Sequence, residues 1–238
     1  MVAQFEQFGG QKQCPGRICP KDETPVPVFP MNLTSAGCSA IGGGGFSMNG
    51  GAVDGEQSID ACCDLYHSCL QICGSTKSFC DSSFEKCMDK KCESIHNAEE
   101  KKKCETAVST KKIMLQLSQC PEFTLGQGDN CECVKNDEVS AKRSKVVRGF
   151  YKKFNPSAVD KADVLVAKAN DKNKFAGLIY KLIEKYPKAI KKVIDPRQQT
   201  LEDMMNDGKF KSRFEGTGAK IDSDEINDID DSEEKIEL

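Results

Sequence analysis

The sequence is poor in several residues and patterns that mark common classes of protein. Among its 238 residues there is no tryptophan, there are only two histidines, and no cysteine follows Cys133. Two histidines are too few to act as co-ligands of repeated zinc sites, and the irregular cysteine spacing also argues against zinc. No apolar run is long enough to span a membrane. A net charge of −3 gives no overall attraction to nucleic acid, so no such partner is expected.

Cysteine is instead abundant in the first part of the chain. All 14 cysteines lie between Cys14 and Cys133, and apolar residues make up only 38% of the chain, so we expect disulfides to supplement a lean core. Disulfides indicate the secretory pathway, either the extracellular space or the lumen of the endoplasmic reticulum. Residues 1–7 lack the apolar core of a signal peptide, so either the targeting segment is missing from this sequence, which we expect, or the secretory interpretation is wrong.

Two short motifs agree with a secretory location. Asn32 begins a glycosylation sequon, Asn-Leu-Thr, in a proline-rich stretch, and is a candidate glycosylation site. The last four residues form a variant of the retrieval tetrapeptide of the endoplasmic reticulum: Lys235, Ile236, Glu237 and Leu238. The alternative interpretation is a solubilising acidic tail, because residues 222–238 hold nine acids and one lysine.

The periodicity of apolar residues and cysteines predicts a mainly α fold. Residues 56–74 and 80–96 each repeat such residues at three- and four-residue steps, which predicts an antiparallel helix pair cross-linked along its length. Ser58 is expected to cap the first helix and Gly74 to end it. A third helix is expected over about 99–117. Loops are expected over residues 1–55, which include the glycine run 42–45, and in the closing segment that carries Cys120, Cys131 and Cys133.

The composition changes at about residue 137, where cysteines end and charged helical patterns begin. Helical segments are expected at 139–154, 157–170, 174–186 and 187–194, and disorder is expected after Pro196. The predicted organisation is a disulfide-rich domain, a charged helical extension and a mostly disordered acidic tail, over residues 14–134, 137–196 and 197–238 respectively.

The most informative stretch is Cys62-Cys63-Asp64-Leu65-Tyr66-His67-Ser68-Cys69. It resembles the phospholipase A2 signature, in which two adjacent cysteines precede a His-Asp pair and a further cysteine. The surrounding sequence resembles the group XII secretory phospholipases A2 over about residues 14–134. The matching features are Cys14, Cys19-Pro20, Pro25-x-Pro27, Gly37-Cys38, Cys73-Gly74, Cys80-Asp81, Phe84, Cys87, Cys92, Cys104 and Cys131-Glu132-Cys133.

This resemblance implies a fold and a set of disulfides. The implied fold is a phospholipase A2-like antiparallel helix pair, stapled by disulfides and preceded by a calcium-type loop. The implied pairs are Cys38 with Cys63, Cys62 with Cys87, and Cys69 with Cys80. The pairing of the other cysteines stays open, because sequence alone does not fix it.

The resemblance also assigns roles, and two key positions carry the wrong residue. Tyr66 stands where the family has its catalytic His, His67 stands where it has the Ca²⁺ carboxylate, and Asp81 matches the Asp that orients the His. Loop carbonyls of Gly37, Ser39 and Ile41 would be the remaining Ca²⁺ ligands. A tyrosine, with a pKa of about 10, is a poor base near neutral pH, and imidazole is a poor ligand for Ca²⁺. Binding of Ca²⁺ is therefore expected to be weakened or lost.

His67 is the alternative base, but a shift of one residue turns a side chain by about 100° around a helix and leaves Ser68 at the metal position. We expect Tyr66 to pack in the core with its hydroxyl on Asp81. His96 is expected to be a surface residue.

Three functions follow from this sequence. The first is a phospholipase A2-like protein that binds phospholipid, a membrane surface or a lipid-bearing partner, through an apolar slot between the two long helices, without efficient hydrolysis. The second is an active Ca²⁺-dependent phospholipase that cleaves the sn-2 ester. The third is a scaffold that captures a protein partner through its C-terminal helices. The basic stretches 142–153 and 185–197 are either contacts for anionic headgroups or ordinary solvated surface.

Overall fold

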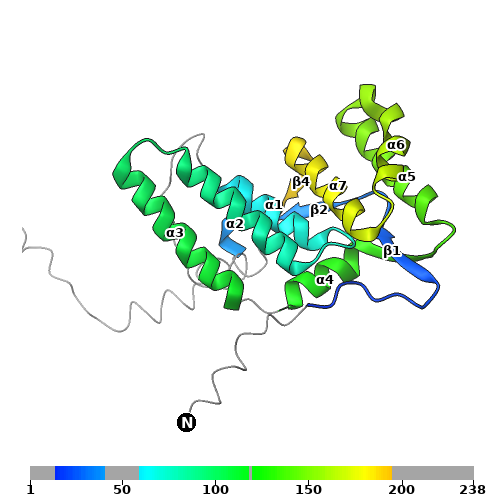
Figure 1. Ribbon diagram of the computed structural model, residues 1–238, viewed down its shortest axis with the longest axis horizontal. Coiled ribbons are helices and arrows are strands. Elements are labelled where there is room, and N and C mark those ends of the chain that lie inside the picture. The colour runs from blue at the N-terminus through cyan, green and yellow to red at the C-terminus, as the bar shows by residue number, and fades with distance from the viewer. Residues whose placement is uncertain (1–13, 41–58, 118–119, 195–238) are drawn as a thin grey trace, which may run out of the picture. The chain divides into compact units, whose positions relative to one another are not determined.

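The computed structural model describes residues 14–40, 59–117 and 120–194, all of which belong to one compact unit. The described part is mainly helical, as predicted, with seven α-helices and four short strands (Figure 1). None of its helices is both long and apolar enough to cross a membrane. The glycine run 42–45, the proposed cap Ser58, Ile41, and the tail from residue 197 with its terminal tetrapeptide lie outside the described residues.

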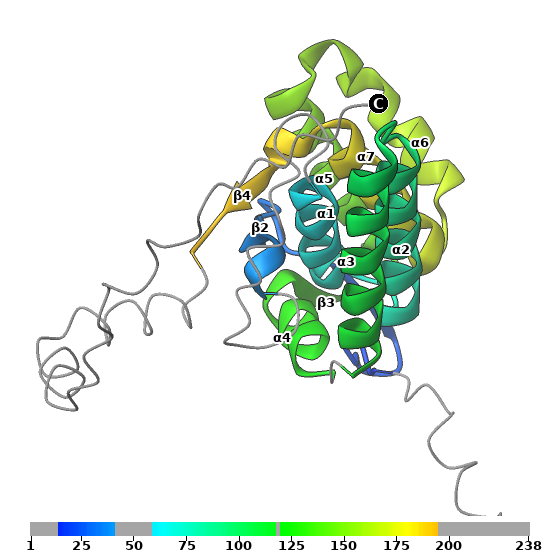
Figure 2. The same cartoon turned by 90° about the vertical axis from the view of Figure 1, so that its left-hand side faces the viewer.

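Three helices form the stapled part of the molecule and lie side by side (Figure 2). They are α1 (Asp60–Gln71), α2 (Lys77–Glu93) and α3 (Ala98–Leu117). The disulfides Cys62–Cys87 and Cys69–Cys80 join α1 to α2 at two levels, so the two helices run antiparallel. Cys92–Cys104 then joins α2 to α3.

The ends of α1 and α2 follow from local chemistry. α1 begins after Ile59 with no side-chain cap, whereas the Thr76 hydroxyl caps α2 by accepting a hydrogen bond from the Phe79 amide at 3.1 Å. Between the helices, Gly74 has φ +80° in a turn that the Ser75 amide closes on the Ile72 carbonyl. A β-carbon at Gly74 would also lie 2.8 Å from the Lys172 carbonyl oxygen, so only glycine suits this position.

The segments predicted to be loops contain regular structure, and that part of the prediction is wrong. Residues expected to form a cysteine-rich closing loop make helix α4 (Pro121–Asn130) and strand β3 (Cys131–Lys135). Pro121 suits the first turn of α4, where its missing amide costs nothing. Within residues 1–55, β1 (Glu23–Pro27) pairs antiparallel with β3, and β2 (Leu33–Ser35) pairs with a strand near the end of the described chain. Prolines are tolerated in β1 because it belongs to a two-stranded sheet.

The helical extension differs from its prediction at two places. Helices α5 (Val139–Phe154) and α7 (Lys172–Lys185) match the expected positions, but the expected helix 157–170 is a 3₁₀ segment (Pro156–Lys161) followed by α6 (Ala162–Lys168). The expected helix 187–194 is wrong. It is a 3₁₀ turn (Pro187–Ala189) and strand β4 (Ile190–Lys192), which runs parallel to β2 with Ile190 opposite Leu33.

The extension shares its core with the stapled part. Leu33 and Ile72, both 2% exposed, belong to the same hydrophobic cluster as buried residues of α5, α6 and α7, among them Val147, Phe175 and Ile183. A second cluster fills the space between α1, α2 and α3. Residues on both sides of the predicted boundary, between residues 134 and 137, therefore pack into one hydrophobic interior.

Candidate functional site

The centre of the candidate site is a hydrogen bond between α1 and α2. Tyr66 on α1 is only 3% exposed, its ring packs 5.2 Å from that of Phe84, and its hydroxyl donates to Asp81 Oδ1 at 3.0 Å. The disulfides on either side, Cys62–Cys87 and Cys69–Cys80, fix the helices in this register. The phenol of Tyr66 thus sits at the carboxylate in the place that the resemblance gives to a histidine.

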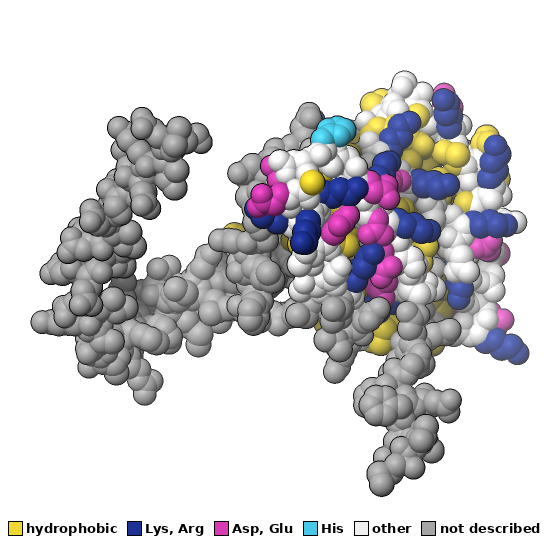
Figure 3. All heavy atoms as spheres, turned by 60° about the vertical axis from the view of Figure 1, so that its left-hand side comes forward, with side chains coloured by type: hydrophobic (Ala, Val, Ile, Leu, Met, Phe, Trp, Pro, Cys, Tyr) yellow, Lys and Arg dark blue, Asp and Glu magenta, His cyan; other side chains and the backbone are white. Residues whose placement is uncertain are grey.

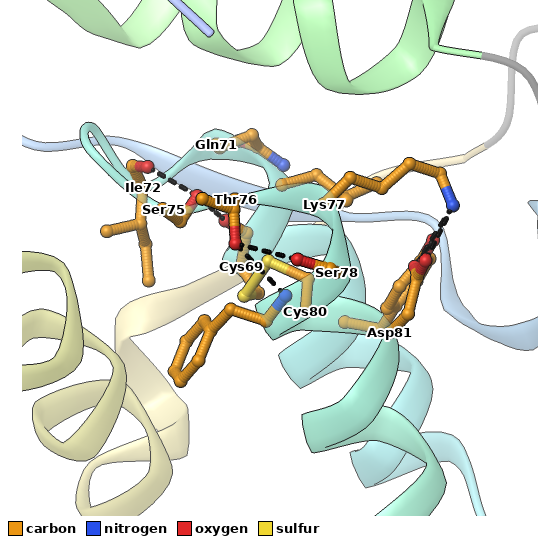
Figure 4. Close-up of a disulfide and its surroundings, with 12 residues drawn as sticks. Cys69, Gln71, Ile72, Ser75, Thr76, Lys77, Ser78, Cys80 and Asp81 are labelled. Carbon is orange, nitrogen blue, oxygen red and sulfur yellow. Dashed lines mark hydrogen bonds and ion pairs between the residues drawn. A yellow bond between two sulfur atoms is a disulfide. The ribbon is translucent and has the colours of Figure 1, made fainter. Parts of the chain in front are cut away.

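Asp81 has a second partner that the sequence analysis missed. The ammonium of Lys77, one turn earlier on α2, lies 2.8 Å from Asp81 Oδ2 and 3.1 Å from Oδ1 (Figure 4). Lys77 Nζ also donates to the Leu115 carbonyl of α3 at 3.3 Å. The i, i+4 spacing of Lys77 and Asp81 is the sequence signal for this pair. The Asp81 charge is therefore compensated by a cation and a phenol, neither of which is a base near neutral pH.

His67 occupies the neighbouring position on α1 and is half-buried. Its ring centroid lies 5.9 Å from that of Tyr66, with the two rings inclined by 71°. The carboxylate of Asp81 accepts hydrogen bonds from Tyr66 and Lys77. His96, in contrast, is exposed at the junction of α2 and α3, as expected.

The loop expected to hold Ca²⁺ is described only at its start. Gly37 and Ser39 lie in a 3₁₀ turn (Gly37–Ala40) that follows β2, and the Cys38–Cys63 disulfide ties this turn to α1. Gly37 has φ +71°, and its amide donates to the Ser35 hydroxyl at 3.0 Å. The side chain at the carboxylate position is the imidazole of His67, and no cluster of three metal-ligating side chains occurs among the described residues. An imidazole at this position is a poorer ligand for a hard cation such as Ca²⁺ than a carboxylate would be.

Another carboxylate on α1 is held by the extension. Asp64, one turn before His67 and 8% exposed, forms an ion pair through Oδ2 with the ammonium of Lys192 on β4. Asp64 Oδ1 and the hydroxyl of Ser68, one turn along the same helix, are buried and have no hydrogen-bond partner among the described residues. Nothing in the local sequence indicates the pairing of Asp64 with Lys192, because it depends on the approach of β4 to β2.

The extension also contains a buried cation. Arg143 is 3% exposed, donates to the carbonyls of Ala169 and Asn170, and lies 4.8 Å from the centroid of the Phe175 ring. Burial lowers the pKa of Arg143, and the nearby charge of Asp171 opposes that shift. Its role is to join α5 to the loop between α6 and α7, away from Tyr66.

The structure contains the three disulfides that the resemblance implies and four more. The implied pairs Cys38–Cys63, Cys62–Cys87 and Cys69–Cys80 are all formed. The others are Cys14–Cys120, Cys19–Cys133, Cys73–Cys131 and Cys92–Cys104. With all 14 cysteines paired, the chain is suited to an oxidising environment. Asn32 is exposed immediately before β2, where a glycan could project into solvent.

Comparison with known proteins adds no assignment. No family model, no curated protein and no solved structure matches the chain significantly. The likeness to the phospholipase A2 signature is therefore carried by the motif residues discussed above, and the chemistry has to be argued from those residues.

Proposed function

We propose that this protein is a phospholipase A2-like component of the secretory pathway that binds phospholipid without efficient hydrolysis. The observation that carries the proposal is the hydrogen bond from the Tyr66 hydroxyl to Asp81 at 3.0 Å. In this proposal, the phenol takes the position at which hydrolysis of an ester would require a base that activates water. The proposed protein thus keeps the shape of the hydrolytic arrangement and has a different chemistry.

Two independent replacements are expected to lower the rate of hydrolysis. Removal of a positioned general base typically lowers a rate by about 10² to 10⁴. Without a carboxylate at position 67, the metal that would stabilise the oxyanion loses its anionic ligand, and that stabilisation is worth several kcal/mol. The pairing of Asp81 with Lys77 supports the same conclusion, because this carboxylate is already engaged.

Binding of phospholipid is supported by the surface. Residues 137–194 carry fifteen lysines and arginines against six acids, so the extension is strongly basic although the whole chain is not. Figure 3 shows one face of the described surface, on which Lys and Arg side chains are interspersed with Asp and Glu and with exposed hydrophobic side chains. The excess of basic residues in the extension suits anionic headgroups.

The contact with lipid is assigned to the surface because the expected slot between α1 and α2 is filled. Tyr66, Leu70, Phe84 and Met88 pack there with exposures of 4% or less. The finer location, retrieval to the endoplasmic reticulum through residues 235–238, is part of the proposal and follows from the terminal tetrapeptide alone.

The test measures hydrolysis and binding on one preparation of the oxidised full chain. Fatty-acid release from mixed phospholipid vesicles is recorded with excess Ca²⁺ and then with chelator, and co-sedimentation with the same vesicles is recorded in parallel. We expect sedimentation without release. Chelator-sensitive release that His67→Ala abolishes would overturn the non-hydrolytic part of the proposal, and a folded protein that stays in the supernatant would overturn lipid binding.

A gain-of-function variant sharpens this test. Tyr66→His combined with His67→Asp restores the residue types of the family signature beside Asp81. Tyr66→His alone is the matched control, since it supplies the base without a carboxylate for the metal. If Tyr66 and His67 are what prevents hydrolysis, release should appear in the double variant, and only with Ca²⁺.

A further inference from the structure

An exposed apolar loop crosses helix α5. It joins β1 to β2, and its residues Val28 and Phe29 are 38% and 41% exposed. The loop is anchored at Val28, whose amide donates to the Asn130 carbonyl at 3.0 Å. A large aromatic side chain is therefore held at the surface on a fixed backbone instead of folding into either hydrophobic cluster.

Helix α5 is shaped to receive this aromatic ring. Gly149 lies beneath Phe29, and a β-carbon built there would come within 3.0 Å of the ring. A glycine inside a helix costs about 1 kcal/mol relative to alanine, so its presence in α5 needs a local reason. The close packing of the Phe29 ring on the backbone of Gly149 is that reason.

Three lysines of α5 lie about one helical turn from Gly149. Lys145 Nζ lies 4.8 Å from the centroid of the Phe29 ring. Lys152 and Lys153 follow Gly149 by three and four residues, so helical geometry places them one turn beyond it on the same side of α5, where Lys153 Nζ lies 5.3 Å from the centroid of the Phe154 ring. All three are exposed, and within the described part of the chain none of them forms an ion pair.

The other exterior cations of α5 behave differently. Lys142 pairs with Glu132 at 3.1 Å, and Arg148 forms an ion pair with Asp163. Among the described residues, the exposed lysines of α5 without an ion-pair partner thus lie within about one turn of the helix position that Phe29 covers. We define Val28, Phe29, Lys145, Lys152 and Lys153 as the Phe29 patch.

We propose that the Phe29 patch is the face by which this protein docks on an anionic phospholipid bilayer. The ring and Val28 enter the interface between headgroups and acyl chains, where aromatic side chains are favoured. The three ammonium groups contact lipid phosphates from the rim. The inference rests on the proposed lipid binding and adds the site and the headgroup charge that it requires.

The first experiment compares two triple variants of the full chain. Lys145→Gln, Lys152→Gln and Lys153→Gln are combined in one protein. The control combines Lys168→Gln, Lys172→Gln and Lys181→Gln, which removes equal charge from exposed positions of α6 and α7. Binding is measured by sedimentation with vesicles of equal parts phosphatidylcholine and phosphatidylserine, and with phosphatidylcholine alone.

One basic side chain near an anionic membrane contributes roughly five-fold in affinity, so the patch variant should bind the anionic vesicles about 100-fold more weakly. The control variant should lose far less. Equal losses in the two variants would show diffuse charge attraction and would overturn the patch while leaving lipid binding intact. Absence of binding by the unmodified chain would instead refute the proposed function.

The second experiment uses the absence of tryptophan from the chain. Phe29→Trp introduces a single fluorophore into the patch, and Leu125→Trp introduces one on α4, where Leu125 is 65% exposed. Anionic vesicles should shift the emission of the first variant to shorter wavelength and leave the second unchanged. A shift caused by a synthetic peptide of residues 222–238, and not by vesicles, would assign the patch to the chain's own acidic segment and overturn membrane docking.

Discussion

The ion pair between Lys192 and Asp64 should respond unequally to removal of its two partners. The side chain of Asp64 is 12% exposed and that of Lys192 is 63% exposed. Because Asp64 Oδ1 has no hydrogen-bond partner in the described part of the chain, Lys192→Met removes the one group seen there to compensate this buried carboxylate. Asp64→Asn instead releases a lysine that water can solvate.

These exposures set the expected magnitudes. Lys192→Met should lower the free energy of unfolding by about 2 kcal/mol, which is below the usual cost of a fully buried unpaired charge because some solvent reaches Asp64. Asp64→Asn should cost less than about 1 kcal/mol, as for a pair with one exposed partner. The double variant should cost about 1 kcal/mol, which gives a coupling energy on the order of 1 to 2 kcal/mol.

Denaturant unfolding with intact disulfides measures the cycle, and amide hydrogen exchange locates the effect. Exchange should accelerate in β2 and β4 and at the Val193 amide, which donates to the Ser35 carbonyl at 2.9 Å. Lys191→Met is the matched control, since Lys191 is the exposed neighbour on the same strand. Equal effects of Lys192→Met and Asp64→Asn, or strict additivity in the double variant, would refute the reasoning.

Three further predictions concern other elements. Tyr66→Phe removes a hydrogen bond to a partly exposed charge and should lower unfolding free energy by about 1 to 2 kcal/mol in denaturant titrations; an unchanged midpoint would contradict the contact with Asp81. Asp171 caps α7, and the hydrogen bond from the Lys174 amide lowers the pKa of the Asp171 carboxyl. The stabilisation of the fold by this cap is therefore fully present above the unfolded-state pKa of about 4 and disappears as pH falls through the folded-state pKa. Asp171→Ala should therefore lower the melting temperature at neutral pH but not in strong acid, while a pH-independent difference would contradict this origin. Gly149→Ala should displace Phe29 and weaken binding to anionic vesicles in sedimentation, although it improves helix propensity; undiminished binding would argue against the seat on α5.

Most of the helical fold could be predicted from the sequence because the signals are local. Apolar residues and cysteines at helical spacing located α1, α2, α3, α5 and α7 to within a few residues. The positions of the motif cysteines also predicted that Tyr66 lies beside Asp81, because the geometry of a helix determines which residues share a face.

The strands could not be predicted in this way. β1 contains two prolines, which locally indicate a loop, and it forms only because β3 lies beside it. β4 is three residues long and has a local pattern typical of a helix end. The ion pair of Asp64 with Lys192 depends on β4, so this part of the site was also beyond local reasoning. The ion pair of Lys77 with Asp81 could have been predicted, because the two residues are four apart on one helix.

The pairing of β2 with β4 has a consequence for synthesis of the protein. Every cysteine lies at or before Cys133, so the complete set of thiols has left the ribosome before Ile190 is made. At typical rates of elongation the interval is on the order of ten seconds or less. During that time Leu33 has no strand partner and no extension to cover it, although residues around it are ready for oxidation. A nascent chain halted between these two points would expose this apolar surface, so this is the stage of synthesis at which a chaperone would have the largest apolar surface to bind.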